Sequence, residues 1–320
     1  MTRRAWVLFA AMCVIWGVPY LLIRVAVRDI APGTLVFLRT AVGGLILVPL
    51  ALANGGFGPV LRRWRPLVAF AAIEMATPWV LLSDAERHLS SSLSGLLIAA
   101  VPFVGVLIAW LTRSDERADR LQLAGLGVGL VGVALLVGLD FGRIQVAALM
   151  ELLVVVVCYA VGPVIMSRSL AALPSIPVAC SALLLVGIGY LPYAVLRPPT
   201  HVAATGWWSV AVLAVVCTAL AFVLFFALVA SIGPARSTVI TYVNPAVAVA
   251  CGVLLLGEDL TVGMVIGFPL ILAGSVLGAR GRRTDQSIRT VPVAVSNTAA
   301  TSPVPSSDVS HATSTPSSGC

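Results

Sequence analysis

The sequence predicts an all-α integral membrane protein with ten transmembrane helices in two inverted five-helix repeats. Three observations lead to this fold class. Of the 320 residues, 59% are hydrophobic and only 10% are charged, compared with about 25% charged residues in an ordinary soluble domain. The chain also divides into ten apolar runs, and a pattern of residues in its first half returns in its second half.

The apolar runs have the length that an α-helix needs to cross about 30 Å of hydrocarbon, which is about 20 residues. No cleavage site of small residues follows the first run, so we expect it to be retained as a helix. The expected spans are Trp6 to Val27, Thr34 to Ala53, Pro66 to Leu82, Leu89 to Leu111, Leu121 to Leu139, Val146 to Ile165, Ile176 to Leu196, Trp207 to Ser231, Ser237 to Leu256 and Val262 to Ala279.

The spacing of residues in the first half recurs 143 positions later, which indicates a duplicated module. Each copy contains five spans. Because five is odd, the second copy enters the membrane from the opposite side, and the repeats are inverted. We expect the two repeats to cover residues 1–140 and 141–280. The matched positions are Ser94 with Ser237, Pro102 with Pro245, and Asp115-Glu116 with Glu258-Asp259.

The placement of arginine predicts the orientation of the chain. The formal net charge is +7, and every basic residue is Arg. These residues gather in 62–65, 113–120 and 280–283, which the order of spans puts on the side of the N-terminus. Loops rich in Arg stay in the cytoplasm. We expect a multi-pass protein of the plasma membrane (a bacterial inner membrane) with both termini cytoplasmic, a membrane-lipid environment and no nucleic-acid partner.

Glycine pairs four residues apart in the fifth and tenth spans predict close approach of helix backbones. Such pairs serve packing within the chain or contact in a homodimer. We favour packing within the chain because these pairs are common in bundles of many helices. The pairs are Gly125 with Gly129, Gly263 with Gly267, and Gly274 with Gly278.

Several classes of function lack their sequence signatures. The chain has no GxxxxGK[ST] motif for ATP and no Rossmann glycine pattern. Its Cys and His residues lack the spacing of metal ligands. We therefore expect no metal, no cofactor and no enzymatic activity. The apolar runs end near residue 280, and residues 281–320, rich in Ser, Thr and Pro, are expected to form a disordered cytoplasmic tail.

Four stretches of the chain resemble an EamA-type member of the drug/metabolite transporter superfamily. The resemblance covers residues 5 to about 280 and implies ten helices in two inverted repeats around a central substrate cavity, with the fifth and tenth helices peripheral. In one departure, Cys158, Tyr159 and Ala160 stand opposite Ile15, Trp16 and Gly17, so the two halves of the cavity differ. The stretches are Trp16-Gly17 with Tyr20, PGTLVFLR from Pro32 to Arg39, AERHLSSSLSGLLIAAVP from Ala85 to Pro102, and GPARSTVITYVNPAVAVACGVLLLGEDLT from Gly233 to Thr261.

Two charged residues fall inside predicted spans, where a charge is costly and needs a partner. Glu74, near the middle of the third span, is a candidate for coupling or for binding a substrate ammonium group. Arg39, in the second span, is a candidate for holding a substrate carboxylate by two hydrogen bonds. Alternatively the two residues form a structural ion pair, or Arg39 bonds helix carbonyls. Their counterparts in the second repeat are Ala182 and Cys217, so the charge belongs to one half only.

Polar residues at helical spacing mark one face of the ninth span. Ser237, Thr241 and Asn244 follow the pattern i, i+4 and i+7. In the fourth span Ser94 shares such a face with Ser91. In a lipid environment, faces of this kind line a cavity or bond a neighbouring helix, and both interpretations stay open.

Prolines within the fourth and ninth spans predict kinks. Pro102 and Pro245 lack an amide hydrogen and leave the carbonyls of Ile98 and Thr241 without their helical donors. Transporter sites use such interrupted helices, so both prolines are candidate hinges. The alternative is a kink without function.

Aromatic residues inside the spans offer apolar walls with polar tips for an amphipathic solute. The alternative is packing, or a place in the aromatic belt at the membrane interface. The candidates are Trp16, Tyr20, Trp79, Tyr159 and Tyr242.

Together these features favour a secondary transporter of the plasma membrane that moves a small metabolite, an amino-acid-like or amphipathic solute, by alternating access, with export as the expected direction. The substrate-binding candidates are Trp16, Tyr20, Arg39, Glu74, Trp79, Ser94, Tyr159, Ser237, Thr241, Tyr242 and Asn244, with Glu74 also the coupling candidate. The alternative is a lipid-handling flippase or scaffold.

Overall fold

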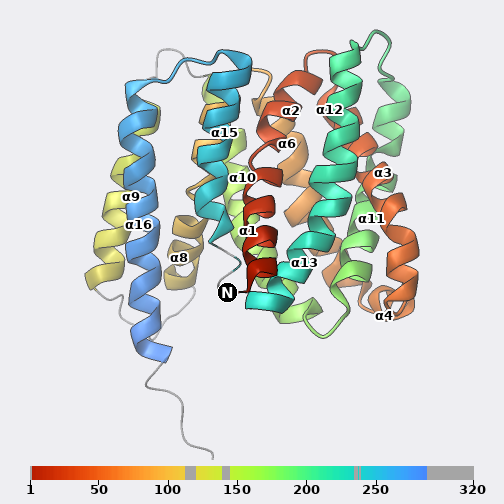
Figure 1. Cartoon of the computed structure of the whole chain (residues 1–320), viewed down its shortest axis with the longest axis horizontal. Coiled ribbons are helices and arrows are strands. Elements are labelled where there is room, and N and C mark those ends of the chain that lie inside the picture. The colour runs from red at the N-terminus through yellow and green to blue at the C-terminus, as the bar shows by residue number, and fades with distance from the viewer. Residues whose placement is uncertain (1, 112–119, 139–144, 234–236, 238, 287–320) are drawn as a thin grey trace, which may run out of the picture.

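The computed structural model of the chain describes residues 2–111, 120–138, 145–233, 237 and 239–286, and within them every regular element is a helix (Figure 1). The pair Asp115-Glu116 and the predicted tail beyond Gln286 lie outside the described residues. The helices of the first half are α1 (Arg3–Ile15), α2 (Pro19–Ala26), α3 (Pro32–Ala53), α4 (Gly58–Leu61), α5 (Trp64–Phe70), η1 (Ala71–Ala76), α6 (Thr77–Ala85), α7 (Ser91–Ile98), α8 (Val101–Leu111) and α9 (Arg120–Gly138).

The second half continues with helices of similar length, and its last helix runs beyond the final apolar run. α16 reaches Gln286, past the expected start of the tail at residue 281, because the loss of apolar side chains ends burial but does not end backbone hydrogen bonding. The helices are α10 (Val146–Ile165), η3 (Met166–Leu170), α11 (Ser175–Leu196), α12 (Ala204–Ala214), η4 (Val215–Leu220), α13 (Ala221–Ile232), α15 (Ile240–Leu256) and α16 (Val262–Gln286).

Six helical segments in the described part of the chain are long and apolar enough to cross a membrane. They coincide with the first, second, third, sixth, seventh and eighth predicted spans. The other four predicted spans contain shorter apolar helices, so a total of ten crossings stays a prediction. The long segments are Arg3–Ala26, Pro32–Ala53, Trp64–Ala85, Val146–Leu170, Ser175–Leu196 and Ala204–Ile232.

Proline interrupts two of the predicted spans. α1 ends at Ile15, four residues before Pro19, and α7 ends at Ile98, four residues before Pro102. In each case the proline cannot donate to the carbonyl one turn earlier, and the helix breaks there. Pro245 behaves differently, because it lies inside the continuous helix α15. The two candidate hinges are therefore unequal, and only Pro102 coincides with a break.

Helices at matching positions of the two halves pack against each other. α3 and α11 start and end 143 positions apart and contact each other along their lengths. α9 and α16 form the same kind of pair at the opposite edge of the bundle (Figure 1). α7 likewise packs against α15 between these edges. Each predicted half therefore completes its packing with the other half.

The glycine faces of α9 and α16 are used inside the chain, as the favoured interpretation predicts. A Cβ atom on Gly132 would lie 2.7 Å from the main-chain nitrogen of Ile271 and 2.9 Å from the carbonyl oxygen of Gly267. A Cβ on Gly267 would lie 2.7 Å from the carbonyl oxygen of Gly132. The two backbones touch, so larger residues at these positions would separate the helices.

We predict that Gly132→Ala lowers the melting temperature of the purified protein in detergent by several degrees. The added methyl group meets main-chain atoms, which cannot move aside cheaply, and overpacking of this kind costs about 1–3 kcal/mol. Gly127→Ala on the same helix is the matched control, because a Cβ there has no atom within 4 Å. Equal melting temperatures for the two variants would contradict the packing described for α9 and α16.

Candidate functional site

Two π-helical turns lie at matching positions of the two halves. η1 covers Ala71–Ala76 and η4 covers Val215–Leu220, and both their starts and their ends are 144 positions apart. π-helical turns are rare and occur often at functional sites. The first carries Glu74, and the second carries Cys217 and Thr218. Sequence reasoning did not find these turns, because no residue pattern specifies them.

Arg39 of α3 is held by the second π turn. Its side chain is only 8% exposed, and its Nε donates a hydrogen bond of 2.8 Å to the Thr218 hydroxyl. That hydroxyl in turn donates to the carbonyl of Leu213, five residues earlier, at 2.8 Å. Gly43 permits the close approach, because a Cβ there would lie 2.8 Å from the Thr218 methyl carbon. A residue of one half thus orients the buried cation of the other.

The far end of the guanidinium group is left free to bind. Its central carbon lies 3.8 Å from the centroid of the Trp79 ring, a cation–π contact. Within the described part of the chain, neither terminal nitrogen of Arg39 has a hydrogen-bond partner. A planar fork of donors in this state fits a carboxylate.

Glu74 does not form the structural ion pair with Arg39 that was the alternative prediction. The Arg87–Asp84 pair is the only ion pair among the residues that the structure describes. Glu74 instead packs against α10 where Gly162 leaves room, and its Oε2 is buried without a hydrogen-bond partner. Arg39 contacts Thr218 of η4 and Glu74 contacts α10, so the two charged side chains have different neighbours, which sequence separation and depth alone could not reveal.

The predicted aromatic residues divide into two groups. Tyr20, Trp79 and Tyr159 lie around Arg39: Tyr159 packs against both large apolar clusters of the core, and the tyrosines are within electrostatic reach of the guanidinium. Trp16 lies elsewhere and packs on Phe225 of α13, with ring centroids 4.7 Å apart. We call Tyr20, Arg39, Trp79, Tyr159 and Thr218 the central cluster. Tyr242 on α15 is half-buried.

The predicted polar face of the ninth span mostly bonds the protein itself. With its nitrogen turned toward them, the Asn244 amide donates to the carbonyls of Ile240 at 2.9 Å and Cys13 of α1 at 3.1 Å. The buried Ser237 hydroxyl donates to Gly233 at 2.9 Å. Thr241 also has an interaction partner. In α7, Ser94 is fully buried and its hydroxyl has no partner in the described residues. Asn244 therefore bonds a neighbouring helix through Cys13, whereas the Ser237 bond is local to its own segment, and cavity lining by this face stays a prediction.

A second polar site, which sequence reasoning missed, lies at the end of the bundle opposite the N-terminus, here called the distal end (Figure 1). Glu258 follows α15 and accepts four hydrogen bonds at the start of α7. They come from the amide and hydroxyl groups of Ser91, at 2.8 and 3.0 Å, and of Ser92, at 2.9 and 2.5 Å. A carboxylate is stabilised there by the unpaired amides and dipole of a helix N-terminus. This contact, the distal latch, ties the two halves together.

Glu86 lies beside the distal latch but, unlike Glu258, it accepts no hydrogen bond through its carboxylate from the described residues. It follows the span that ends at Ala85, its side chain is fully buried, and neither carboxylate oxygen has a hydrogen-bond partner among the described residues. The Arg24 side chain donates to the main-chain carbonyl of Glu86 instead. Burial raises the pKa of Glu86 well above its ordinary value, the Glu258 carboxylate raises it further, and Arg24 opposes the shift.

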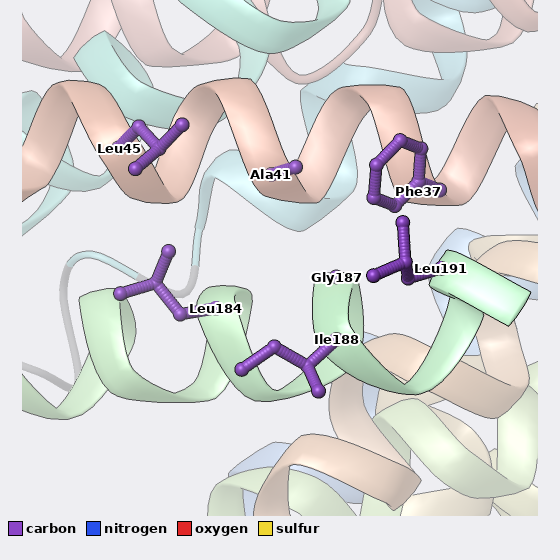
Figure 2. A pocket seen from close by; sticks show the side chains of 7 residues that line it. All are labelled: Phe37, Ala41, Leu45, Leu184, Gly187, Ile188 and Leu191. Atoms are coloured by element: carbon purple, nitrogen blue, oxygen red, sulfur yellow. The ribbon is translucent and has the colours of Figure 1, made fainter.

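An apolar groove runs between α3 and α11 (Figure 2). It encloses about 170 Å³, and none of the predicted site residues lines it. Figure 2 shows side chains from both helices pointing into it. They are Phe37, Ala41, Leu45, Leu184, Gly187, Ile188 and Leu191.

Apolar helices of membrane-spanning length, packed into one bundle in which the two halves pair, define a multi-pass membrane protein. Among the described residues no His, Cys, Asp or Glu cluster could hold a metal ion. The chain belongs to the EamA-like transporter family, whose model matches residues 3–138 and 147–279.

Known proteins of similar sequence carry transporter names. A probable amino-acid metabolite efflux pump of Salmonella typhimurium is 27% identical over 89% of this chain and 98% of its own. A probable terminal-alkyne amino-acid exporter of Streptantibioticus cattleyicolor is 30% identical over 88% of this chain and 92% of its own. The inner membrane transporter YedA of Escherichia coli, itself uncharacterized, is 25% identical over 85% and 89%. These names indicate a transporter rather than an enzyme.

The fold is shared with proteins of known structure, of which one crystal structure serves as the example. It superposes with a TM-score of 0.63 at 20% identity and covers 89% of this chain and 100% of its own. This likeness concerns the fold alone.

We predict that Glu258→Gln lowers the melting temperature, because an amide offers one acceptor oxygen to donors that now surround two. Hydrogen bonds to charged groups contribute about 1.5–3 kcal/mol each. Asp259→Asn is the matched control, since Asp259 is exposed and adjacent in sequence. Thermal unfolding in detergent measures both. A melting temperature of Glu258→Gln no lower than that of the control would contradict a stabilising role for the distal latch.

Proposed function

We propose that the protein is a secondary transporter that exports a small amino-acid-like or amphipathic solute across the plasma membrane by alternating access. In this proposal residues 1–140 and 141–280 form inverted five-helix repeats that give ten crossings, both termini are cytoplasmic, and the distal end faces outward. The packing of α3 on α11 and of α9 on α16, at matching positions, supports the repeat. The arginine-rich loops support the orientation.

The free end of the Arg39 guanidinium is the observation that carries the proposal. A cation held inside a membrane bundle needs anionic or carbonyl partners, yet the described residues supply only the Thr218 hydroxyl and the Trp79 ring. A purely structural role for Arg39 accounts for the bond from Nε but leaves the terminal nitrogens unexplained. A solute carboxylate completes their hydrogen bonding, and Tyr20, Trp79 and Tyr159 provide its apolar and polar surroundings.

The same cluster connects solute binding to movement of the two halves. Arg39 belongs to the first half, whereas the Thr218 that orients it and Tyr159 belong to the second. A rigid-body rotation of one half against the other therefore changes the geometry of the solute site, as alternating access requires. Glu74, within electrostatic reach of Tyr159, remains the proposed site for a substrate ammonium group or for coupling.

The names of two relatives give the proposal its solute class and direction. Both the Salmonella and the Streptantibioticus proteins are named for the outward movement of amino acids or their metabolites. An amino acid carries a carboxylate that fits Arg39, so the names and the geometry point to the same chemistry. We extend this chemistry, and export as the direction, to the present chain.

A lipid flippase is the second candidate, and the apolar groove between α3 and α11 is the observation that favours it. Its lining is entirely aliphatic and aromatic, as an acyl chain requires (Figure 2). The groove offers no group for a lipid headgroup, whereas Arg39 lies apart from it. Transfer of fluorescent phospholipid in proteoliposomes, without any solute movement, would establish this candidate in place of the transporter.

We predict that Arg39→Gln raises the KM for an amino acid at least about tenfold, because one charge-assisted hydrogen bond is worth about 1.5–3 kcal/mol. Proteoliposomes are screened with the standard amino acids by counterflow, and the best solute is compared with the amine that lacks its carboxylate. The variant should lose the preference for the acid over the amine.

The control for this experiment is Arg87→Gln, which removes an exposed arginine that pairs with Asp84 at the distal end. It should leave the preference for the acid unchanged. Arg39→Gln transporting both compounds as the unaltered protein does would show that Arg39 is structural, and would contradict the proposed solute site.

A further inference from the structure

The distal end contains two carboxylates whose surroundings differ in a way that solute binding at Arg39 does not explain. Glu258 accepts four hydrogen bonds and is accommodated as an anion. Glu86 is fully buried, and both of its oxygens lack a donor among the described residues. An ionised carboxylate in such a place is strongly destabilised, and a bound proton removes that penalty.

We propose that Glu86 is the proton-binding site of the transporter, and that its charge controls the distal latch between Glu258 and the start of α7. This inference rests on the proposed function, since a coupling proton has meaning only if solute moves. Glu74 lies on a different turn and is half-buried. Glu86 is therefore a second carboxyl group, at a different position, and its role is to bind the proton that controls the distal latch.

The charged and titratable groups around Glu86 determine what its proton does. Arg24 of α2 bonds the main-chain carbonyl of Glu86 and leaves the carboxyl group unpaired. Glu258 after α15, Tyr20 of α2 and Arg39 of α3 are within electrostatic reach. Because Glu258 carries the like charge, an ionised Glu86 repels it and weakens the distal latch. A protonated Glu86 removes this repulsion and leaves the latch intact.

This relation fits the order of events in a proton-driven exporter. With the distal end open, the solute leaves and Glu86 takes a proton from the outer water. The neutral carboxyl allows Glu258 to close on Ser91 and Ser92, which shuts the distal end. The proton then leaves to the inner water as the bundle opens there, and solute binding at Arg39 starts the return. One proton moves inward for each passage, and no other reactant is consumed.

Proteoliposomes separate the proton site from the solute site. With the amino acid found by counterflow screening, an imposed pH gradient should drive accumulation several-fold above equilibrium in the unaltered protein. Glu86→Gln should abolish this accumulation. Because its side chain is permanently neutral and favours the closed distal latch, the variant should also show slower solute-for-solute counterflow that no longer depends on pH. Asp259→Asn, which removes an exposed carboxylate nearby, should accumulate solute normally.

Each other outcome has one meaning. Gradient-driven accumulation that persists in Glu86→Gln overturns the proton site and leaves the transporter standing. Loss of accumulation in Glu74→Gln alone assigns the proton to Glu74 and likewise overturns it. Counterflow in the unaltered protein without any response to the gradient also overturns it. Absence of counterflow for every amino acid and for the amphipathic carboxylates tested beside them refutes the proposed function instead.

A second measurement works on the unaltered protein and does not depend on the variant folding. Dicyclohexylcarbodiimide modifies protonated carboxyl groups in apolar surroundings, and peptide mass analysis locates the adduct. Glu86 should be modified at neutral pH, with labelling that falls as the pH rises. Labelling of Glu74 with none at Glu86 would overturn the proposal even if no transported solute were known.

Discussion

The arrangement of the bundle depends on how it accommodates the buried guanidinium of Arg39. A cation inside a membrane helix must be hydrogen-bonded or face a solute. Here the α3 helix brings it against the second π turn, where the Thr218 hydroxyl accepts from Nε at 2.8 Å. Gly43 gives the space for that approach, and the Trp79 ring covers the guanidinium from the other side. The position of α3, the space at Gly43 and the Trp79 ring therefore all contribute to accommodating the Arg39 cation.

The carboxylates show the same constraint with three different solutions. Glu258 obtains four donors from a helix N-terminus, Glu74 packs against a glycine of α10, and Glu86 has no donor among the described residues. The first contact holds the halves together, and the other two leave carboxyl groups for which a proton is the simplest partner. These carboxyl groups thus lie where the two halves meet, and a movement of one half against the other would change their surroundings.

Much of the fold could be predicted from the sequence, because hydrophobic length and glycine spacing act locally. The long apolar helices occur where the apolar runs predicted them, and Gly274 packs within the chain against Gly125 and Gly129. The prolines were only partly predictable: Pro102 lies at the start of α8, just after a break, whereas Pro245 lies within the continuous helix α15. Whether a helix breaks depends on its neighbours, which a single sequence does not report.

The site was harder to predict, because its contacts join residues far apart in the chain. Arg39 and Glu74 share a repeat and a similar depth, which suggested an ion pair, but the partner of Arg39 is Thr218 of the other half. The distal latch joins Glu258 to Ser91 over 167 positions. The acidic pair Glu258-Asp259 and the serines at 90–92 stand out in the sequence. Nothing in the sequence indicates that Glu258 accepts hydrogen bonds from the helix that begins at Ser91.

The central claim is that Thr218 of one half orients Arg39 of the other to bind the solute carboxylate. A double-mutant cycle on the KM for the transported amino acid tests it directly, with Thr218→Val, Arg39→Lys and the pair. Lysine keeps the charge but lacks the Nε donor that Thr218 accepts. The account predicts that Thr218→Val raises KM in the arginine protein and has little further effect in the lysine variant, with a coupling of about 1 kcal/mol or more. Independent, additive effects of the two substitutions would contradict it.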